Sequence, residues 1–312
     1  MEGDFEKKHS AAIDLSAAML YNVCVRVLKE SENMKKVVTI QDISCFGKCS
    51  LTVALPVISA MGIETAVIPT AVLSTHTGGF QGFTFRDLTS DIPAIADHWK
   101  SLGLRFDGIY TGYLGSIEQV RIVSDFFGDF GREDNFIVVD PAMADGGRLY
   151  TGFSQDFVAE MRKLCSRADY IIPNMTEASF LLDIPYTEDY DQAYAEKVLR
   201  RLADLGCPMP VLTGVHFDGE KQGAAAYDSR TGEFCYHFRK TVDRTLHGTG
   251  DIFSSVFTGA VTLGMPLSQA VRTAVDYTAD CIEATAGSFD EVWYGSCFEL
   301  CLDKLIGYVK NR

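Results

Sequence analysis

Short runs of β-branched and other apolar residues alternate with longer segments of helical period from residue 36 onward. Consecutive apolar residues indicate buried strands, whereas apolar residues three or four positions apart indicate helices with one buried face. The predicted strands are 36–41, 64–69, 107–111, 136–140, 169–172 and 208–213. The predicted helices between them are 51–61, 87–102, 117–127, 154–165 and 191–205. This alternation is typical of βαβ units, so we expect an α/β fold with a mostly parallel central sheet flanked by helices.

The pattern changes in the last third of the chain. Two short apolar runs, 223–227 and 234–238, are separated by the turn-rich interval 228–233 and predict an antiparallel hairpin at the sheet edge. Three helices are predicted after the hairpin, at 249–263, 267–286 and 296–310. Because no Pro/Ser-rich linker and no internal repeat interrupts this order, we expect one domain over residues 34–312.

The first 33 residues differ from the rest of the chain. Residues 2–10 are charged, and residues 11–27 are moderately apolar with Asp14 and Asn22 among them. No convincing small-residue cleavage site follows, which argues against a secretory signal. We interpret residues 1–33 as an N-terminal extension that is either helical or disordered.

The composition of the chain argues against some classes of function. The 312 residues are 47% hydrophobic and 22% charged, enough for a large core, and they carry a formal net charge of −14. An acidic surface repels phosphate backbones, so we expect no nucleic-acid partner. No run of about 18 apolar residues occurs, so we expect no membrane span. Nine cysteines without a regular framework indicate buried free thiols in a reducing cytoplasm.

A Gly-Thr-Gly turn opens the apolar helix near residue 249. Backbone N–H groups at a helix start lack partners within the helix and can hold an anion. Gly248, Thr249 and Gly250 therefore predict an anion site, with Asp251 in the same first turn. The alternative is that Thr249 or Asp251 only caps the helix, and the local sequence leaves both interpretations open.

Polar residues follow three successive predicted strands. The carboxyl ends of parallel strands form the ligand-binding edge of open α/β sheets, and oxygen ligands suit a nucleotide phosphate with its Mg²⁺. Taken singly, Asp145 and Glu177 each fit a solvated loop residue or a helix cap better than a ligand. The residues concerned are Asp140 and Asp145, Asn174 and Glu177, and Thr213 and Gly214.

These motifs resemble those of the ribokinase-like superfamily, specifically its pyridoxal (vitamin B6) kinase branch. The resemblance covers about residues 36–286, and its order and spacing are more specific than any single motif. Neither a Walker A sequence nor a protein-kinase glycine loop is present. The matching segments are Gly248–Asp251, Thr75–Gly78, Thr111–Tyr113, Asp140–Pro141 with Asp145, and Asn174 with Glu177.

The resemblance implies phosphorylation of the 5′-hydroxymethyl group of a B6 vitamer by ATP. Asp251 would be the general base, and Gly248, Thr249 and Gly250 would form an anion hole around the transferred γ-phosphoryl group. The resemblance also suggests a homodimer acting on a small molecule.

The cofactors implied are ATP and Mg²⁺, and a role for a monovalent cation such as K⁺ stays open. Asp145 and Glu177 would serve Mg²⁺ directly or through water. Asn174, Thr213 and Gly214 would line the nucleotide site.

The substrate site follows from the resemblance in the same way. Thr77 would hydrogen-bond the pyridine ring, Tyr113 would contact it, and His247 would lie beside it, although ordinary packing also explains Tyr113. Asp42 stands where pyridoxal kinases commonly have serine. It either faces the ligand, and then affects the choice of vitamer, or points to solvent from a loop.

Two other functions compete with this prediction. A hydroxymethylpyrimidine kinase of thiamin synthesis shares the fold and the catalytic aspartate, but its usual glycine-rich substrate loop is replaced here by residues 43–48. A B6-binding protein without kinase activity would have lost Asp251 or the Gly-Thr-Gly turn, and both are intact.

Overall fold

The structure is a computed structural model that describes residues 34–242, 244, 246–288 and 292–310. The chain divides into the units Met1–Lys35 and Lys36–Arg312, and the fold below is that of the second unit. The predicted extension, residues 1–33, lies outside the described residues.

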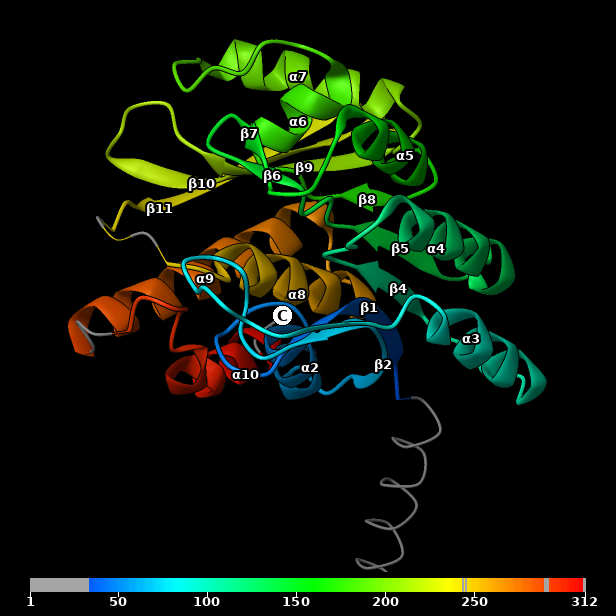
Figure 1. The fold of residues 1–312 in the computed structure, drawn as a ribbon. Helices are drawn as coiled ribbons and strands as arrows, with labels where there is room; N and C mark the ends of the chain where they lie inside the picture. Colours follow the sequence, from blue (N-terminus) through cyan, green and yellow to red (C-terminus); the bar gives the residue numbers. More distant parts are fainter. Residues whose placement is uncertain (1–33, 243, 245, 289–291, 311–312) are drawn as a thin grey trace, which may run out of the picture. The chain divides into compact units, whose positions relative to one another are not determined.

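A nine-stranded sheet forms the centre of this unit (Figure 1). Its strands are β1 (Lys36–Ser44), β2 (Glu64–Leu73), β3 (Phe85–Asp87), β4 (Gly108–Thr111), β5 (Phe136–Val139), β8 (Tyr170–Ile171), β9 (Met209–Val215), β10 (Lys221–Asp228) and β11 (Glu233–Lys240). The spatial order is β11-β10-β9-β8-β5-β4-β1-β2-β3. The strands from β9 to β2 in this order pair in parallel, whereas β3, β10 and β11 pair antiparallel with their neighbours. The predicted α/β fold with an antiparallel edge hairpin is confirmed.

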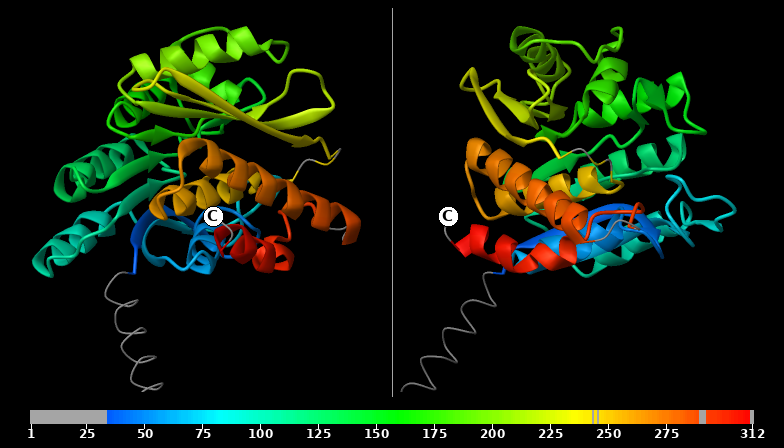
Figure 2. Two further views of the ribbon diagram at one scale, coloured as in Figure 1. Left: turned by 180° about the vertical axis from the view of Figure 1, so that it is seen from behind. Right: turned by 90° about the vertical axis from the view of Figure 1, so that its left-hand side faces the viewer.

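Helices cover both faces of the sheet (Figure 2). One face carries α2 (Leu51–Ala60), α8 (Thr249–Thr262), α9 (Leu267–Ser288) and α10 (Leu302–Lys310). The other carries α3 (Asp91–Ser101), α4 (Ile117–Phe130), α5 (Gln155–Cys165), α6 (Met175–Leu182) and α7 (Gln192–Asp204). On β1, Val37 packs toward the first layer and Val38 toward the second, because side chains of a strand alternate between faces. Both sides of β1 are therefore buried, as its continuous apolar run indicates.

Several predicted boundaries are wrong. The helix predicted at 87–102 begins at Asp91, because Asp87 belongs to β3 and pairs with Ala71 of β2. The helix predicted at 296–310 is a 3₁₀ turn, η1 (Phe298–Cys301), followed by α10. The short β3, the hairpin of β6 (Ala144–Asp145) and β7 (Arg148–Leu149), and helix α6 are elements that the hydrophobic pattern does not predict. Two- and three-residue strands are too short to show a period.

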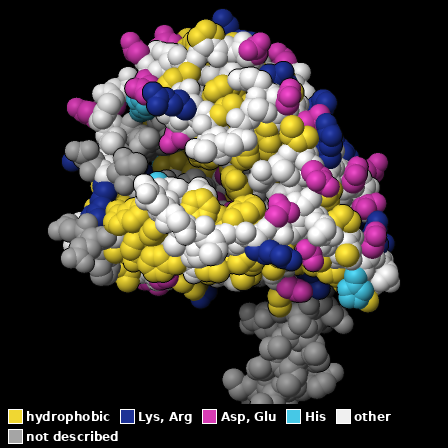
Figure 3. Space-filling view, in the orientation of Figure 1, with side chains coloured by type: hydrophobic (Ala, Val, Ile, Leu, Met, Phe, Trp, Pro, Cys, Tyr) yellow, Lys and Arg dark blue, Asp and Glu magenta, His cyan; other side chains and the backbone are white. Residues whose placement is uncertain are grey.

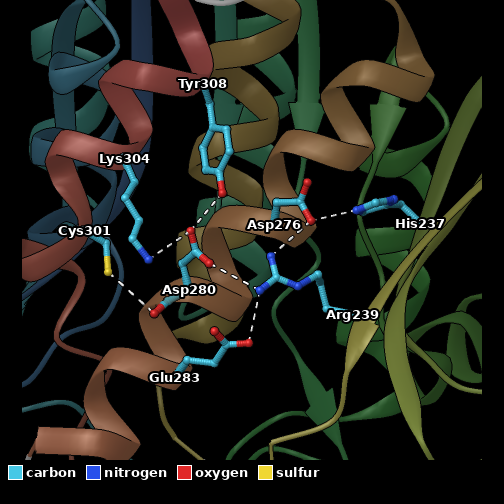
Figure 4. Close-up of polar contacts among 8 residues, drawn as sticks. All are labelled: His237, Arg239, Asp276, Asp280, Glu283, Cys301, Lys304 and Tyr308. Atoms are coloured by element: carbon cyan, nitrogen blue, oxygen red, sulfur yellow. Dashed lines mark hydrogen bonds and ion pairs between the residues drawn. The ribbon is translucent and has the colours of Figure 1, made fainter.

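Helix α9 binds the edge strand β11 and helix α10 through acidic side chains on one face (Figure 4). Arg239 of β11 lies 3.3 Å from Asp276, 3.4 Å from Asp280 and 3.1 Å from Glu283. The hydroxyl of Tyr308 in α10 donates to the Asp280 carboxylate at 2.8 Å. Asp280 is thus a buried junction between two elements far apart in sequence. The remaining members of the network are His237, Cys301 and Lys304.

No helix within the described part of the chain has the length and apolarity needed to cross a membrane.

Candidate active site

Helix α8 begins at the Gly-Thr-Gly turn. Gly248 occupies the N-cap position with φ of 76°, and a Cβ atom there would lie 1.8 Å from the carbonyl oxygen of Lys48. Only glycine fits this left-handed position against the loop that follows β1. Because the cap residue has no side chain, none is available there to accept from the first-turn N–H groups. A Cβ atom at Gly250 would meet open space, so the first turn faces outward and can receive an anion.

Asp251 lies half-buried in this first turn. Burial first, and then the charges of Asp140 and Asp42, raise the pKa of its carboxyl from 3.8 to about 8. The backbone N–H of Ser50 donates to the carboxylate and acts in the opposite direction. A carboxyl group with a raised pKa is a stronger base toward an alcohol than an ordinary aspartate.

Asp140 directly follows β5 and is buried. Its carboxylate accepts hydrogen bonds from Ser254 Oγ at 2.7 Å and from the backbone N–H of Ala142 at 3.2 Å. Burial raises its pKa to about 6 despite both hydrogen bonds. Ser254 lies in the same helix as Asp251, so its hydrogen bond holds the residue after β5 against α8.

Glu177 has its carboxylate oxygens occupied by the backbone. One oxygen accepts from the N–H groups of Met143 at 2.9 Å and Ala144 at 3.4 Å, and the other accepts from Asn174 at 3.0 Å. Asn174 completes a capping box by accepting from the Glu177 N–H at 2.9 Å. Burial, followed by the charge of Asp140, raises the pKa of Glu177 to about 8. Glu177 and Asn174 therefore hold the segment after β5 against helix α6.

Asp145 differs from the other acidic residues because it is exposed. It lies in β6, and its Oδ1 accepts from the backbone N–H of Gly146 at 2.9 Å. Among the described residues, no three His, Cys, Asp or Glu side chains are close enough to hold a metal by themselves. Mg²⁺ usually keeps several waters and takes one or two carboxylates plus substrate phosphates. The exposed oxygens of Asp145, beside the buried acids, fit such an ion.

Tyr150 is a site residue that the sequence does not indicate. Burial raises the pKa of its hydroxyl far above the ordinary value, and four carboxylates add to this effect. In order of their influence they are Glu177, Asp145, Asp140 and Asp251. Each of the four carboxylates is therefore close enough to the Tyr150 hydroxyl to act on it electrostatically. Its position depends on the β6–β7 hairpin, which the hydrophobic pattern does not predict.

Asp42 is buried, so its side chain does not point to solvent. Strand β1 continues past Gln41 to Ser44 with an irregular register, so Asp42 belongs to the strand and not to the loop after it. Its carboxylate accepts from Ser44 Oγ at 3.0 Å, and burial raises its pKa. The pKa of Tyr113 is raised first by burial and then by the charge of Asp42. Tyr113 also packs on Phe153, with ring centroids 5.6 Å apart.

The predicted nucleotide residues also come together. Thr213 forms a parallel bridge with Asn174, and its N–H donates to Pro173 at 3.0 Å. Gly214 follows with φ of 68° and is exposed. Thr77 and His247 are exposed, and the ring of His247 lies beside that of His76, with centroids 5.0 Å apart. In the space-filling view this face is hollowed between the loop after β2 and the part that carries β6, β7 and β10 (Figure 3).

Comparison with known proteins identifies the family. The family model described as phosphomethylpyrimidine kinase matches residues 52–292. The chain belongs to the phosphomethylpyrimidine kinase family. The resemblance that the motifs indicate is thus confirmed for the family and the fold.

Two solved structures are similar over most of the chain. A putative phosphomethylpyrimidine kinase from Bacteroides thetaiotaomicron, crystallised with pyridoxal, is 41% identical with a TM-score of 0.83, over 88% of this chain and 96% of that one. The pyridoxal kinase from Lactobacillus plantarum is 31% identical with a TM-score of 0.82, over 90% and 99% of the two chains. A hydroxymethylpyrimidine/phosphomethylpyrimidine kinase from Haemophilus influenzae is 27% identical over 78% of this chain and 90% of its own length. Members of this phosphomethylpyrimidine kinase family therefore include enzymes named for two different substrates.

Proposed function

We propose that the protein transfers the γ-phosphoryl group of ATP to the 5′-hydroxymethyl group of a B6 vitamer. The observation that carries the proposal is the position of Asp251, which pairs a base of raised pKa with an outward-facing helix start. The neighbour crystallised with pyridoxal and the neighbour named pyridoxal kinase, at 41% and 31% identity, support this substrate class.

Asp251 would take the proton from the substrate hydroxyl as its oxygen attacks the γ-phosphorus. The oxygen–phosphorus bond to the substrate forms while the bond to the ADP leaving group breaks. The N–H groups at Gly248, Thr249 and Gly250 would stabilise charge on the transferring group, because donors aimed at developing charge act strongly where water is excluded. Asp42, whose charge raises the pKa of Tyr113, would contact the substrate ring together with Tyr113.

Asp145 and Glu177 would hold Mg²⁺, Asp145 through its exposed oxygens and Glu177 through water, since its own oxygens already accept three N–H groups. Mg²⁺ bound with ATP supplies positive charge to the phosphates. Asn174, Thr213 and Gly214 would contact the nucleotide, which their mutual bridge and the turn at Gly214 support.

The second candidate is a hydroxymethylpyrimidine kinase, which the Haemophilus influenzae relative favours. We would incubate the purified protein with Mg-ATP and pyridoxal, pyridoxamine, pyridoxine or hydroxymethylpyrimidine, and measure each phosphorylated product. We expect kcat/KM at least tenfold higher for one of the B6 vitamers than for hydroxymethylpyrimidine. The reverse ratio would establish the second candidate instead.

A homodimer in the cytoplasm is the proposed state of the enzyme. The free thiols of the described cysteines support a reducing compartment. Light scattering measures the oligomeric state, and a twofold monomer mass would agree with the proposal. Running the kinase assay in KCl and in tetramethylammonium chloride tests whether K⁺ takes part.

A further inference from the structure

One side of helix α8 is polar although it is buried. Its residues recur three and four positions apart, so they lie on one face of the helix. All of them except the half-buried Asp251 are 1% exposed or less. The buried face of a helix is ordinarily apolar, because burial of apolar surface stabilises it. We call this set the polar stripe: Asp251, Ser254, Ser255 and Thr258.

The sheet carries buried polar side chains on the face that packs against α8. Tyr110 of β4 and Thr39 of β1 are partners in the parallel register, and Gln41 follows Thr39 on the same face. This is the face of α8, since Tyr110 belongs to the same core layer as the apolar side chains of that helix. Asp140, after β5, accepts from Ser254 of the polar stripe at 2.7 Å. The polar stripe therefore meets polar groups of three strands in the interior.

Several of these groups lack a regular hydrogen bond. Gln41 donates through Nε2 to Thr39 Oγ1 at 2.7 Å, but Gln41 Oε1 has no partner among the described residues. The hydroxyls of Tyr110, Ser255 and Thr258 are likewise buried and, within the described chain, without a hydrogen-bond partner. Buried hydroxyl and amide groups are nearly always paired, so a group of four unpaired atoms under one helix calls for an explanation.

Tyr110 is the side chain at which the unpaired groups converge. Its pKa is raised well above the ordinary value, first by burial and then by the charges of Asp140 and Asp251, whereas side-chain contacts with Ser255 and Gln41 lower it. Ser255 and Gln41 therefore lie within reach of the hydroxyl, although neither meets it in the geometry of a regular hydrogen bond. The phenol stays protonated at neutral pH and can donate to either oxygen.

This arrangement costs stability. Phenylalanine at position 110 and alanine at position 255 would need no hydrogen-bond partner, and replacing paired polar groups by apolar ones of similar shape is often neutral or stabilising. Departures of this kind occur at functional sites, where the place of a reacting group matters more than stability. Ser255 follows Asp251 by four positions on the same face of α8, so a contact that fixes Ser255 on the sheet also fixes Asp251.

We propose that Tyr110 is a positioning residue for Asp251: with Ser255 and Gln41, its hydroxyl sets how the first two turns of α8 sit on the sheet. The inference rests on the proposed function, in which Asp251 takes the substrate proton. Gly248 is held separately, against the carbonyl of Lys48, so the anion site depends less on Tyr110. A displaced base slows proton transfer without weakening the binding of either substrate.

Tyr110→Phe removes only the hydroxyl. We expect kcat to fall at least tenfold while KM for ATP and KM for pyridoxine stay within twofold. Ser255→Ala should lower kcat by a similar factor, and the double variant should be no slower than the slower single variant, because both changes remove one shared contact. Circular dichroism shows whether each variant is folded, and Ser255→Ala decides if Tyr110→Phe does not fold. An unchanged kcat, or a rise in KM that accounts for the loss, would overturn the proposal.

Thr258→Val is the matched control. It removes a buried, unpaired hydroxyl from the same stripe, about one turn farther from Asp251, with little change of shape. We expect kcat of this variant to stay within twofold of the wild type. A loss as large as that of Tyr110→Phe would show that the hydroxyls under α8 serve packing alone, and the positioning role would be wrong.

The Asp251→Asn background separates this inference from the proposed function. A residue that acts through Asp251 has no effect once the base is gone, so adding Tyr110→Phe should change the residual kcat by less than twofold. A further tenfold fall would give Tyr110 a role independent of Asp251 and overturn the proposal. A wild type that phosphorylates no B6 vitamer, or an Asp251→Asn variant with wild-type kcat, contradicts the proposed function. Activity that is lost in Asp251→Asn but kept in Tyr110→Phe contradicts only the inference.

Discussion

Replacing Asp251 by asparagine removes an ionisable group from the first turn of α8 while changing the side-chain volume very little. If Asp251 is the general base, kcat should fall by about 10²–10⁴-fold, which corresponds to about 3–5 kcal/mol of activation free energy. Nucleotide affinity should stay within about threefold, because the N–H groups of Gly248–Gly250 and the residues at Thr213 are unchanged. Steady-state kinetics and equilibrium binding of an ATP analogue measure the two quantities.

The same variant should be more stable than the wild type at alkaline pH. Burial, Asp140 and Asp42 raise the pKa of Asp251 from 3.8 to about 8, so folding disfavours its ionised form. A group with a raised pKa contributes stability below pH 4 and loses that contribution as the pH rises to about 8. At 1.36 kcal/mol per pKa unit the upper bound is about 6 kcal/mol, and solvent contact of the half-buried side chain reduces it to about 2–4 kcal/mol.

Urea unfolding without nucleotide at pH 5, 7 and 8.5 tests this expectation. The stability advantage of Asp251→Asn should grow with pH and reach about 2–4 kcal/mol at pH 8.5. Asp125→Asn, which changes an exposed carboxyl on α4, serves as the matched control and should show no such trend. The reasoning fails if Asp251→Asn retains more than about a tenth of wild-type kcat, or if it is no more stable than the wild type at pH 8.5.

Four further outcomes are expected. The wild-type kcat/KM should rise with pH, with an apparent pKa near 8. Asp42→Ser should lower this apparent pKa, because a negative charge that raises the pKa of Asp251 is lost. An unchanged apparent pKa would contradict the influence of Asp42 on Asp251. Asp42→Ser should also lower the pyridoxamine/pyridoxal ratio of kcat/KM by about tenfold, as a shielded charge-assisted hydrogen bond is worth about 1.5–3 kcal/mol; an unchanged ratio would exclude Asp42 from vitamer choice. Deleting residues 1–33 should leave a folded, active enzyme, since every site residue follows Met34; loss of activity would assign the extension a structural role. Asp280→Asn should lower the free energy of unfolding by about 2–3 kcal/mol, because it weakens the contacts of Asp280 with Arg239 and Tyr308. Glu283→Gln, at the exposed end of the same network, should lower it by less than about 1 kcal/mol. Equal losses of stability in the two variants would contradict the role of Asp280 as the junction.

The central sheet and the edge that carries the acids follow from the sequence because both depend on local patterns. Apolar runs give the strands, and the parallel order brings the residues after β5, β8 and β9 to one edge. The sequence could not predict which of these acids face a ligand. The carboxylate oxygens of Glu177 accept hydrogen bonds from three backbone N–H groups. Asp42 is buried because β1 continues past Gln41.

The contacts that sequence reasoning misses all cross between loops. Tyr150 reaches four carboxylates because of a short hairpin, and His76 joins Gly78 to Tyr294. Tyr150 belongs to no periodic segment and no motif, and although His76 lies in the Thr75–Gly78 motif, its contact with Tyr294 is not visible in the sequence. Contacts between loops depend on the whole tertiary structure. A short motif contains only one of the two residues that form such a contact.

The surroundings of Asp251 explain how this aspartate would act as a base. Burial raises the pKa of Asp140, Glu177 and Asp251, and the charge of Asp140 adds to this effect for Glu177 and Asp251, so all three ionise less readily than free carboxylic acids. If Asp251 takes the substrate proton as proposed, burial favours the neutral acid that results. The burial that disfavours the ionised form of Asp251 in the free protein would therefore also strengthen the base, and the expected effects of Asp251→Asn on stability and on turnover share one cause.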